Sequence, residues 1–150
     1  MLSITRSVRR FLLPCFVLTG VLLDPGSAQQ GNPDMATAGG FILVNGANAN
    51  FGLNARDPSD PSGHVNYVDH GTGLHVRSTD ITAYIIVNAT TRRIEGTAVL
   101  DDGTTVTFVV IVTDNGEPGT SDTFSISLSN GYSASGTLVG GNVQVHTPAP

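Results

Sequence analysis

The sequence predicts an all-β protein, an antiparallel meander of about eight to ten short strands forming a barrel-like sheet or a sandwich. Short runs of β-branched and aromatic residues alternate with polar residues, which is the period of a half-buried strand. Turns containing glycine separate these runs, and the chain has 18 glycines. The 3.6-residue periodicity of an amphipathic helix does not occur after residue 38.

The N-terminal region has the organisation of a secretory signal peptide. Three arginines within residues 6–10 precede an apolar run over residues 11–23, and small residues follow at 26–28. We therefore expect cleavage after Ala28 and a secreted, extracellular or periplasmic product. The run is short for a transmembrane helix. Cys15 lies inside the run with no small residue before it, so we expect no membrane anchor.

Removal of residues 1–28 would change the composition in ways that restrict function. The only cysteine would be lost, so the mature chain would form no internal disulfide. Eleven acidic residues would face four arginines and no lysine, a net charge of −7 with neutral histidines. This charge makes nucleic acid and anionic membranes poor partners. We expect an extracellular ligand or protein partner of unknown identity.

The mature chain is expected to hold one domain. Residues 29–38 are polar and lack a pattern, so we predict a flexible lead-in there and a single all-β domain over residues 39–147. The predicted strands lie near residues 40–44, 48–56, 64–70, 74–78, 81–87, 92–100, 104–113, 122–129, 132–139 and 142–146.

Side-chain alternation predicts the turns, because residues that face each other in an antiparallel pair must share a face of the sheet. A three-residue loop ending at Gly131 places Leu128 opposite Tyr132, whereas a two-residue loop would bury serines. The same argument predicts a three-residue loop ending at Gly103. Both glycines are expected at positive φ, in the bulge position that follows a type I turn.

Two further turns are predicted to contain two residues each. Asn45-Gly46 is the first, and Gly140-Gly141 is the second. The second turn would pair Leu138 with Val143 and keep both on the apolar face. On this basis the strands between residues 92 and 146 form one continuous meander.

Several stretches of the chain resemble a known family. They are GHVNYVDHGTGLHV at 63–76, RIEGTA at 93–98, TDNGEPGTSDTFSISLSNGYSASGTLVGGNVQVH at 113–146 and, more loosely, NFGLNAR at 50–56. They resemble the post-COAP type domain of bacterial secreted proteins. The resemblance implies a secreted β module, often appended to larger proteins, and brings no established activity, cofactor or substrate.

The acidic connection over residues 114–122 is the candidate calcium site. Asp114, Asn115, Glu117 and Asp122 supply carboxylate and amide oxygens, the ligand types that calcium prefers. Their spacing differs from that of an EF-hand. The favoured alternative is a structural connection in which Asp114 and Asp122 accept hydrogen bonds from loop amides.

His70 and His75 are candidate ligands for a transition metal. An even loop over residues 71–74 would place them opposite each other, roughly 5 Å apart at Cβ. Catalytic zinc usually has three protein ligands, and only two are found here. A structural or surface role is therefore favoured for both histidines.

The sequence contains no recognisable catalytic motif. Asp69 and His70 are adjacent on a predicted strand and therefore point to opposite faces. We expect a non-catalytic exported β module that serves adhesion, envelope structure or ligand binding. One alternative is a small secreted hydrolase or metal-dependent enzyme that uses His70, His75 and the acidic loop. Another is a barrel that binds an apolar ligand in its lumen.

Overall fold

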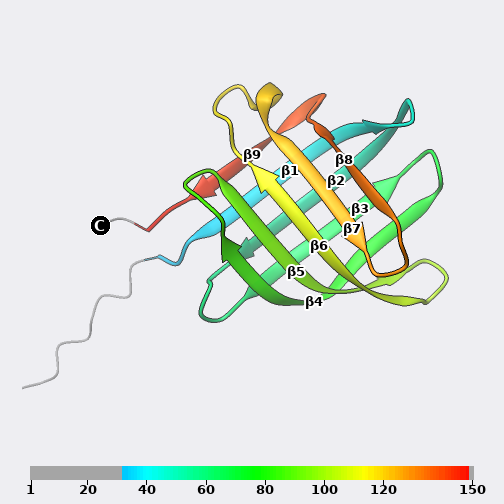
Figure 1. Ribbon diagram of the computed structural model, residues 1–150, viewed down its shortest axis with the longest axis horizontal. Coiled ribbons are helices and arrows are strands. Elements are labelled where there is room, and N and C mark those ends of the chain that lie inside the picture. The colour runs from blue at the N-terminus through cyan, green and yellow to red at the C-terminus, as the bar shows by residue number, and fades with distance from the viewer. Residues whose placement is uncertain (1–31, 149–150) are drawn as a thin grey trace, which may run out of the picture.

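A computed structural model describes residues 32–148, which form one antiparallel sheet of nine strands (Figure 1). The strands are β1 (Met35–Val44), β2 (Ala47–Arg56), β3 (Ser62–Asp69), β4 (Leu74–Ile86), β5 (Thr91–Leu100), β6 (Thr105–Thr113), β7 (Thr123–Leu128), β8 (Ser133–Thr137) and β9 (Gly140–His146), with a short 3-10 helix, η1 (Gly119–Ser121), before β7. The predicted all-β class is confirmed. The predicted signal peptide lies outside the described residues. The described part of the chain has no helix long and apolar enough to span a bilayer.

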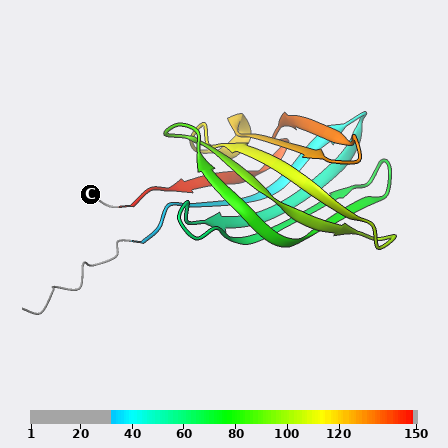
Figure 2. The ribbon, with the colours of Figure 1, turned by 60° about the horizontal axis from the view of Figure 1, so that its bottom comes forward.

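The sheet curls until its two edges approach each other (Figure 2). Its order is β8-β7-β6-β5-β4-β3-β2-β1-β9, so β1 to β8 form a meander and β9 returns to β1. The segment between β8 and β9 passes from one edge of the sheet to the other, and two neighbouring residues mark the change. The Leu138 N–H donates to the Asp122 carbonyl at the β7 edge, and the Val139 N–H donates to the Phe41 carbonyl of β1. The result is a barrel-like sheet.

The meander places its connections at two opposite ends. One end, here called the loop end, carries the four hairpin turns at residues 45–46, 70–73, 101–103 and 129–131. The opposite end, here called the terminal end, carries the connections at 57–61, 87–90 and 114–122. It also holds the start of β1 and the end of β9, which pair as Met35 with His146.

Aromatic side chains fill the interior of the curled sheet. The rings of Phe51 and Phe124 stack with their centroids 4.0 Å apart, and Tyr67 stacks on Phe124 at 5.8 Å. These residues come from β2, β3 and β7, and β7 is not a sheet neighbour of the other two, so the rings meet across the interior. This packing argues against the predicted lumen for an apolar ligand.

The predicted flexible lead-in over residues 29–38 is wrong in its second half. Asp34 is only 3% exposed, Ala36 is fully buried, and β1 begins at Met35. Small residues in this stretch make the apolar and polar faces of the strand hard to tell apart in the sequence. It is a strand because β2 and β9 pair with it on both sides, which is a tertiary effect.

Two predicted strands, at 74–78 and 81–87, are one strand in the structure. β4 runs through both and keeps its pairing with β5 across two register shifts, between Ser78 and Asp80 and between Ile81 and Ala83. Such bulges interrupt the side-chain alternation. The interruption is what made one bent strand resemble two.

The turns predicted from alternation are confirmed at three places. Leu128 faces Tyr132 across a three-residue loop, and Gly131 has a φ of 93°. The loop ending at Gly103 also has three residues, and its glycine has a φ of 82°. Asn45-Gly46 forms the predicted two-residue turn.

The turn predicted at Gly140-Gly141 is wrong. β9 does not fold back on β8; it pairs with β1, so that Gly40 faces Gly141. A Cβ at Gly40 would lie 2.2 Å from the Gly140 carbonyl oxygen, and one at Gly141 would lie 2.1 Å from that of Gly39. The glycines therefore permit a close approach between distant strands instead of a local turn.

Candidate functional site

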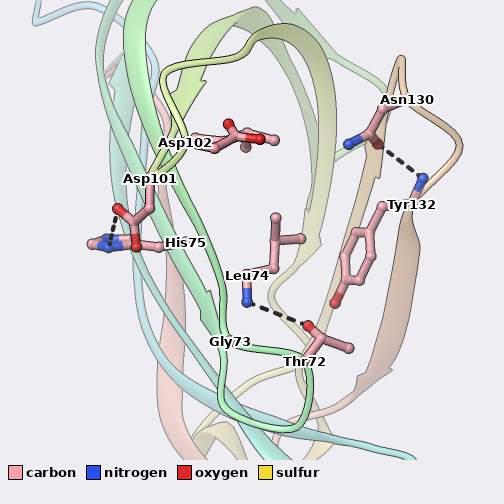
Figure 3. Close-up of a pocket in the computed structure, with 9 residues that line it drawn as sticks. Thr72, Gly73, Leu74, His75, Asp101, Asp102, Asn130 and Tyr132 are labelled. Carbon is pink, nitrogen blue, oxygen red and sulfur yellow. Dashed lines mark hydrogen bonds and ion pairs between the residues drawn. The ribbon is translucent and has the colours of Figure 1, made fainter.

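Three hairpin turns at the loop end line an open pocket of about 410 Å³ (Figure 3). It is lined by Thr72, Gly73, Leu74, His75, Leu100, Asp101, Asp102, Asn130 and Tyr132. These residues come from the β3–β4, β5–β6 and β7–β8 connections, which are adjacent because each links neighbouring strands of one meander. The pocket is thus formed by turns that are distant in sequence.

The pocket has an apolar floor and a polar rim. Leu74 points into the hollow, with the ring of Tyr132 beside it and Asp102 and Asn130 above it (Figure 3). Leu100, at the end of β5, adds a nearly buried apolar side chain to the lining. A surface of this kind suits a small ligand that has both an apolar face and hydrogen-bonding groups.

Asp102 and Asn130 are held by their own turns. Oδ1 of Asp102 accepts the Thr104 N–H at 2.8 Å, and this hydrogen bond lowers the pKa of the Asp102 carboxyl. Oδ1 of Asn130 accepts the Tyr132 N–H at 3.1 Å, and Figure 3 places the Asn130 amide nitrogen on the pocket side. The rim therefore presents an ionised acceptor and an amide donor.

A partly buried chain of hydrogen bonds fixes the floor. Tyr132 donates its hydroxyl to Oδ2 of Asp69 at 2.8 Å. Tyr67 therefore donates to the Tyr132 oxygen, at 2.6 Å. Asp69 is 1% exposed and also accepts from the Gly71 N–H and the Thr72 hydroxyl, at 2.8 and 2.9 Å. These bonds hold both Tyr132 and the 70–73 turn in place.

The protonation of this chain is fixed by its surroundings. Burial opposes ionisation of Asp69, but the hydrogen bonds from Tyr132 and Thr72 outweigh it and lower the pKa of the carboxyl. Burial, together with the hydrogen bonds to Tyr67 and Asp69, raises the pKa of the Tyr132 hydroxyl. The chain therefore keeps a carboxylate and neutral tyrosines at physiological pH.

One wall of the pocket is a surface network around His75. Its Nε2 lies 2.8 Å from Oδ1 of Asn66, so Nε2 carries the proton and donates. Nδ1 then accepts from Nη1 of Arg77 at 3.1 Å. Arg77 also pairs with Asp101 at 2.8 Å. Both ring nitrogens of His75 are engaged by protein groups.

The predicted pairing of His70 with His75 is wrong. His75 faces Val68 in the β3–β4 register, and Asp69 faces Leu74. His70 lies in the turn and is exposed. The turn begins one residue earlier than predicted, because Asp69 accepts hydrogen bonds from the turn and caps it. The geometric argument for a shared metal ion is lost, and residues 32–148 contain no group of three or more His, Cys, Asp or Glu that could hold one.

The acidic connection is hydrogen-bonded to β9 at the terminal end. Asp122 is fully buried and accepts the Asn115 and Val143 N–H groups, at 2.8 and 2.7 Å. Asp114 accepts the Gly116 and Val145 N–H groups, at 3.0 and 3.1 Å. The hydrogen bonds that Asp114 and Asp122 were predicted to accept from loop amides are thus present, and each carboxylate also accepts one from a strand amide.

Two of the predicted calcium ligands make other contacts. Oε1 of Glu117 accepts from Nδ2 of Asn142 at 2.7 Å, and Nδ2 of Asn115 donates to the Ser121 carbonyl at 2.7 Å. The Asn142 amide therefore compensates the negative charge of Glu117. Calcium binding by Asp114, Asn115, Glu117 and Asp122 stays a prediction.

The terminal end also holds a buried ion pair that the sequence did not suggest. Nε and Nη2 of Arg92 donate to the two carboxylate oxygens of Asp34, at 2.7 and 2.8 Å, and Tyr84 donates to Oδ1 at 2.5 Å. Burial disfavours a charged Asp34, but the Arg92 and Tyr84 hydrogen bonds lower the pKa of its carboxyl. This bidentate pair ties the segment before β1 to β5.

Sequence reasoning missed the pocket, although a signal for it was present. Turns in a meander alternate between the two ends of a sheet, so those near residues 72, 102 and 130 had to gather at one end.

Comparisons with protein-family models, curated proteins and solved structures found no match. The resemblance to the post-COAP type domain stays a prediction, and the geometry describes a small all-β module with a preformed pocket.

Proposed function

We propose that this protein is an exported, non-catalytic β module that binds an extracellular ligand through the loop-end pocket. The observation that carries the proposal is the pocket itself, in which three short turns hold an apolar floor and a polar rim on a sheet with a filled interior. Ligand contacts on short loops of a rigid scaffold are typical of recognition modules. Export rests on the predicted signal peptide, and mass spectrometry of the secreted product should find Gln29 at its N-terminus.

The ligand class that fits this pocket is neutral and rich in hydroxyl groups, such as a sugar residue. The Leu74 side chain and the Tyr132 ring offer an apolar surface for the C–H face of such a ring. Asp102 can accept a hydrogen bond from a hydroxyl group, and Asn130 can donate one to a hydroxyl oxygen. An anionic ligand fits poorly, because Asp102 has no cationic partner among the described residues, while Asp101 is paired with Arg77.

The hydrogen bonds and the lowered pKa values of the ionisable groups in the site favour a binding role over catalysis. Both nitrogens of His75 make hydrogen bonds to protein groups. The carboxylates of Asp69 and Asp102 accept from their own turns, and the pKa of each is lowered. A general acid or base works best with a pKa near the operating pH. These groups support the shape of the pocket.

Calorimetric titration with a panel of neutral tetrasaccharides, among them cello-, xylo- and mannotetraose, tests the proposal. We expect one class to bind, and Asp102→Asn to weaken its binding by about tenfold, since hydrogen bonds to charged groups are worth more than neutral ones. Asp60→Asn is the matched control at the terminal end and should leave binding unchanged.

The same titration can contradict the proposal in two ways. Absence of binding across the panel, or equal affinity in Asp102→Asn, would remove the pocket as a sugar site. Binding of hexylammonium in place of the saccharides would mean that the acidic rim selects a cation.

A further inference from the structure

A second hollow lies at the terminal end, on the outer surface of β1, β2 and β3. It has a volume of about 380 Å³ and is lined by Met35, Thr37, Asn54, Ala55, Arg56, Ser62 and Gly63. Ala36 and Ala55 are buried, and successive side chains of a strand point to opposite faces. The residues that flank these two alanines therefore face outward, and they include Thr37 and Arg56. We call this hollow the arginine pocket.

The strand register places the polar groups of the arginine pocket in two adjacent rows. Arg56 of β2 lies between Met35 of β1 and Ser62 of β3. In the next row on the same face, Thr37 of β1 is opposite Asn54 of β2. A guanidinium, two hydroxyl groups and an amide therefore come together on three neighbouring strands. Their backbone positions are set by the sheet and not by a loop.

The guanidinium of Arg56 has donors that the described residues do not use. Its Nε donates to the Ser62 hydroxyl oxygen at 3.3 Å, which holds the side chain beside the pocket. Nη1 and Nη2 make no hydrogen bond within residues 32–148. Because Ser62 accepts the bond from Nε, its own hydroxyl proton is free to be donated. Several donors of the pocket are thus available to a ligand.

Arg56 also differs from the other arginines of the described residues in its charge environment. Each of the other three pairs with a carboxylate, whereas Arg56 forms no ion pair within residues 32–148. The carboxylate of Asp57 is near enough to be influenced by Arg56. It is used by its own turn, however, since its Oδ1 accepts from the Ser59 N–H and hydroxyl at 2.9 and 2.6 Å. The arginine pocket therefore offers a positive charge in a chain whose net charge is −5.

We propose that the arginine pocket binds the carboxylate group of a small organic acid. A guanidinium can donate two parallel hydrogen bonds to a planar carboxylate, and Nη1 and Nη2 of Arg56 are available for them. The Ser62 hydroxyl and the Asn54 amide can donate further hydrogen bonds. One guanidinium balances the single negative charge of a carboxylate, whereas a phosphate dianion would keep an unbalanced charge.

Met35 defines the other part of the ligand. It gives the pocket an apolar side next to Arg56, and a methionine side chain adapts to the shape of what it contacts. The volume is near the lower end of the range of about 300–1,000 Å³ that is typical of small-molecule sites. An acid with a short apolar chain fits both properties. None of the lining residues is acidic, so this ligand differs from the neutral one proposed for the loop-end pocket.

An NMR titration with sodium butyrate at constant ionic strength tests the proposal, and butyramide is the neutral probe of similar shape. Butyrate should shift the Nε–H signal of Arg56 and the amide signals of residues 35–37, 54–56 and 62–63, with a Kd on the order of 1 mM. Butyramide should bind at least about tenfold more weakly. Equal affinities would mean that the apolar side alone selects the ligand, and would overturn the proposal.

Two arginine variants assign the binding to one guanidinium. Arg56→Gln removes the charge and should weaken butyrate binding by at least about tenfold, because hydrogen bonds to a charged partner are the stronger ones. Arg93→Gln is the matched control on β5. It removes another partly exposed arginine, one that already pairs with Glu95, and should leave the Kd unchanged.

Three results of these titrations would contradict the proposal. The first is a butyrate titration that shows no saturation up to about 50 mM, well above the expected Kd. The second is an Arg56→Gln variant that binds butyrate as tightly as the wild type. The third is sodium phosphate that saturates the same signals at a lower concentration than butyrate, because the pocket would then select a tetrahedral anion.

Discussion

Arg92 is the largest of the fully buried side chains in the described residues, and its partner Asp34 lies outside every strand. A buried ion pair contributes little net stability when complete, but removal of one partner leaves an unpaired charge away from water. The pair therefore serves mainly to specify one position for the segment before β1. Two side chains thus determine where the segment that precedes β1 lies.

Asp34→Asn should lower the free energy of unfolding by about 3–5 kcal/mol, because Arg92 would stay buried without a counter-charge. Denaturant unfolding of both proteins measures the difference. Asp60→Asn, an exposed aspartate at the same end, is the control and should change stability by less than about 0.5 kcal/mol.

The difference in unfolding free energy between wild type and Asp34→Asn depends on pH because the pKa of Asp34 is lowered in the folded protein. A carboxyl whose pKa is lower in the folded state stabilises the fold above its unfolded pKa of about 3.9 and loses that contribution as the pH falls through the folded value. The difference between wild type and Asp34→Asn should be constant near neutrality and shrink below about pH 4. A difference that persists at pH 2 would contradict the assignment.

Gly131→Ala should cost about 1 kcal/mol, because a non-glycine residue is strained at positive φ. A Cβ at this position would meet no atom within 4 Å, so the backbone conformation is the whole effect. Thermal unfolding of the variant measures it. A loss below about 0.3 kcal/mol would show that the loop changes conformation to accept alanine.

At the scale of elements, the contact between β1 and β9 closes the sheet, and it depends on glycines from both strands. Gly40→Ala should destabilise the protein by about 2 kcal/mol or more, because the new methyl group would overlap backbone atoms of β9. Gly52→Ala, on neighbouring β2, is the matched control, since its Cβ meets nothing within 4 Å. Equal unfolding midpoints for the two variants would contradict the close approach.

The acidic connection is a second element that joins distant segments. Because amide donors already compensate Asp114 and Asp122, we expect no change in Tm between millimolar calcium and a chelator. Asp122→Asn should destabilise by about 1–3 kcal/mol, because a buried N–H loses its acceptor. A calcium-dependent rise in Tm that disappears in this variant would place an ion in the loop.

Sequence reasoning succeeded where the deciding interactions were local. Leu128 and Tyr132 were paired correctly because one turn and one face decide that pairing. It failed at Gly140-Gly141, where both a local turn and a distant strand satisfied the alternation and only the closed sheet separates them. The Asp34–Arg92 pair joins residues 58 positions apart, and neither residue lies in a pattern that predicts the other. The pocket residues belong to three turns, each of which looks ordinary alone.

At the scale of the whole molecule, one curled sheet carries different features at its two ends. The loop end holds the pocket between three turns, and the terminal end holds the Asp34–Arg92 pair. The stacked rings of Phe51, Tyr67 and Phe124 fill the interior, and Tyr67 continues into the hydrogen bonds that fix Tyr132. The pocket is therefore preformed, and ligand binding should require little rearrangement of the sheet.

The central claim, that the loop-end pocket binds a neutral saccharide without chemical change, is tested most directly by one NMR experiment. The amide spectrum of the protein and the proton spectrum of a bound tetrasaccharide are followed together for several days. We predict shifts confined to residues 72–75, 101–104 and 130–132, with the saccharide intact at the end. Shifts elsewhere in the protein, or new saccharide signals from a cleaved bond, would contradict the account.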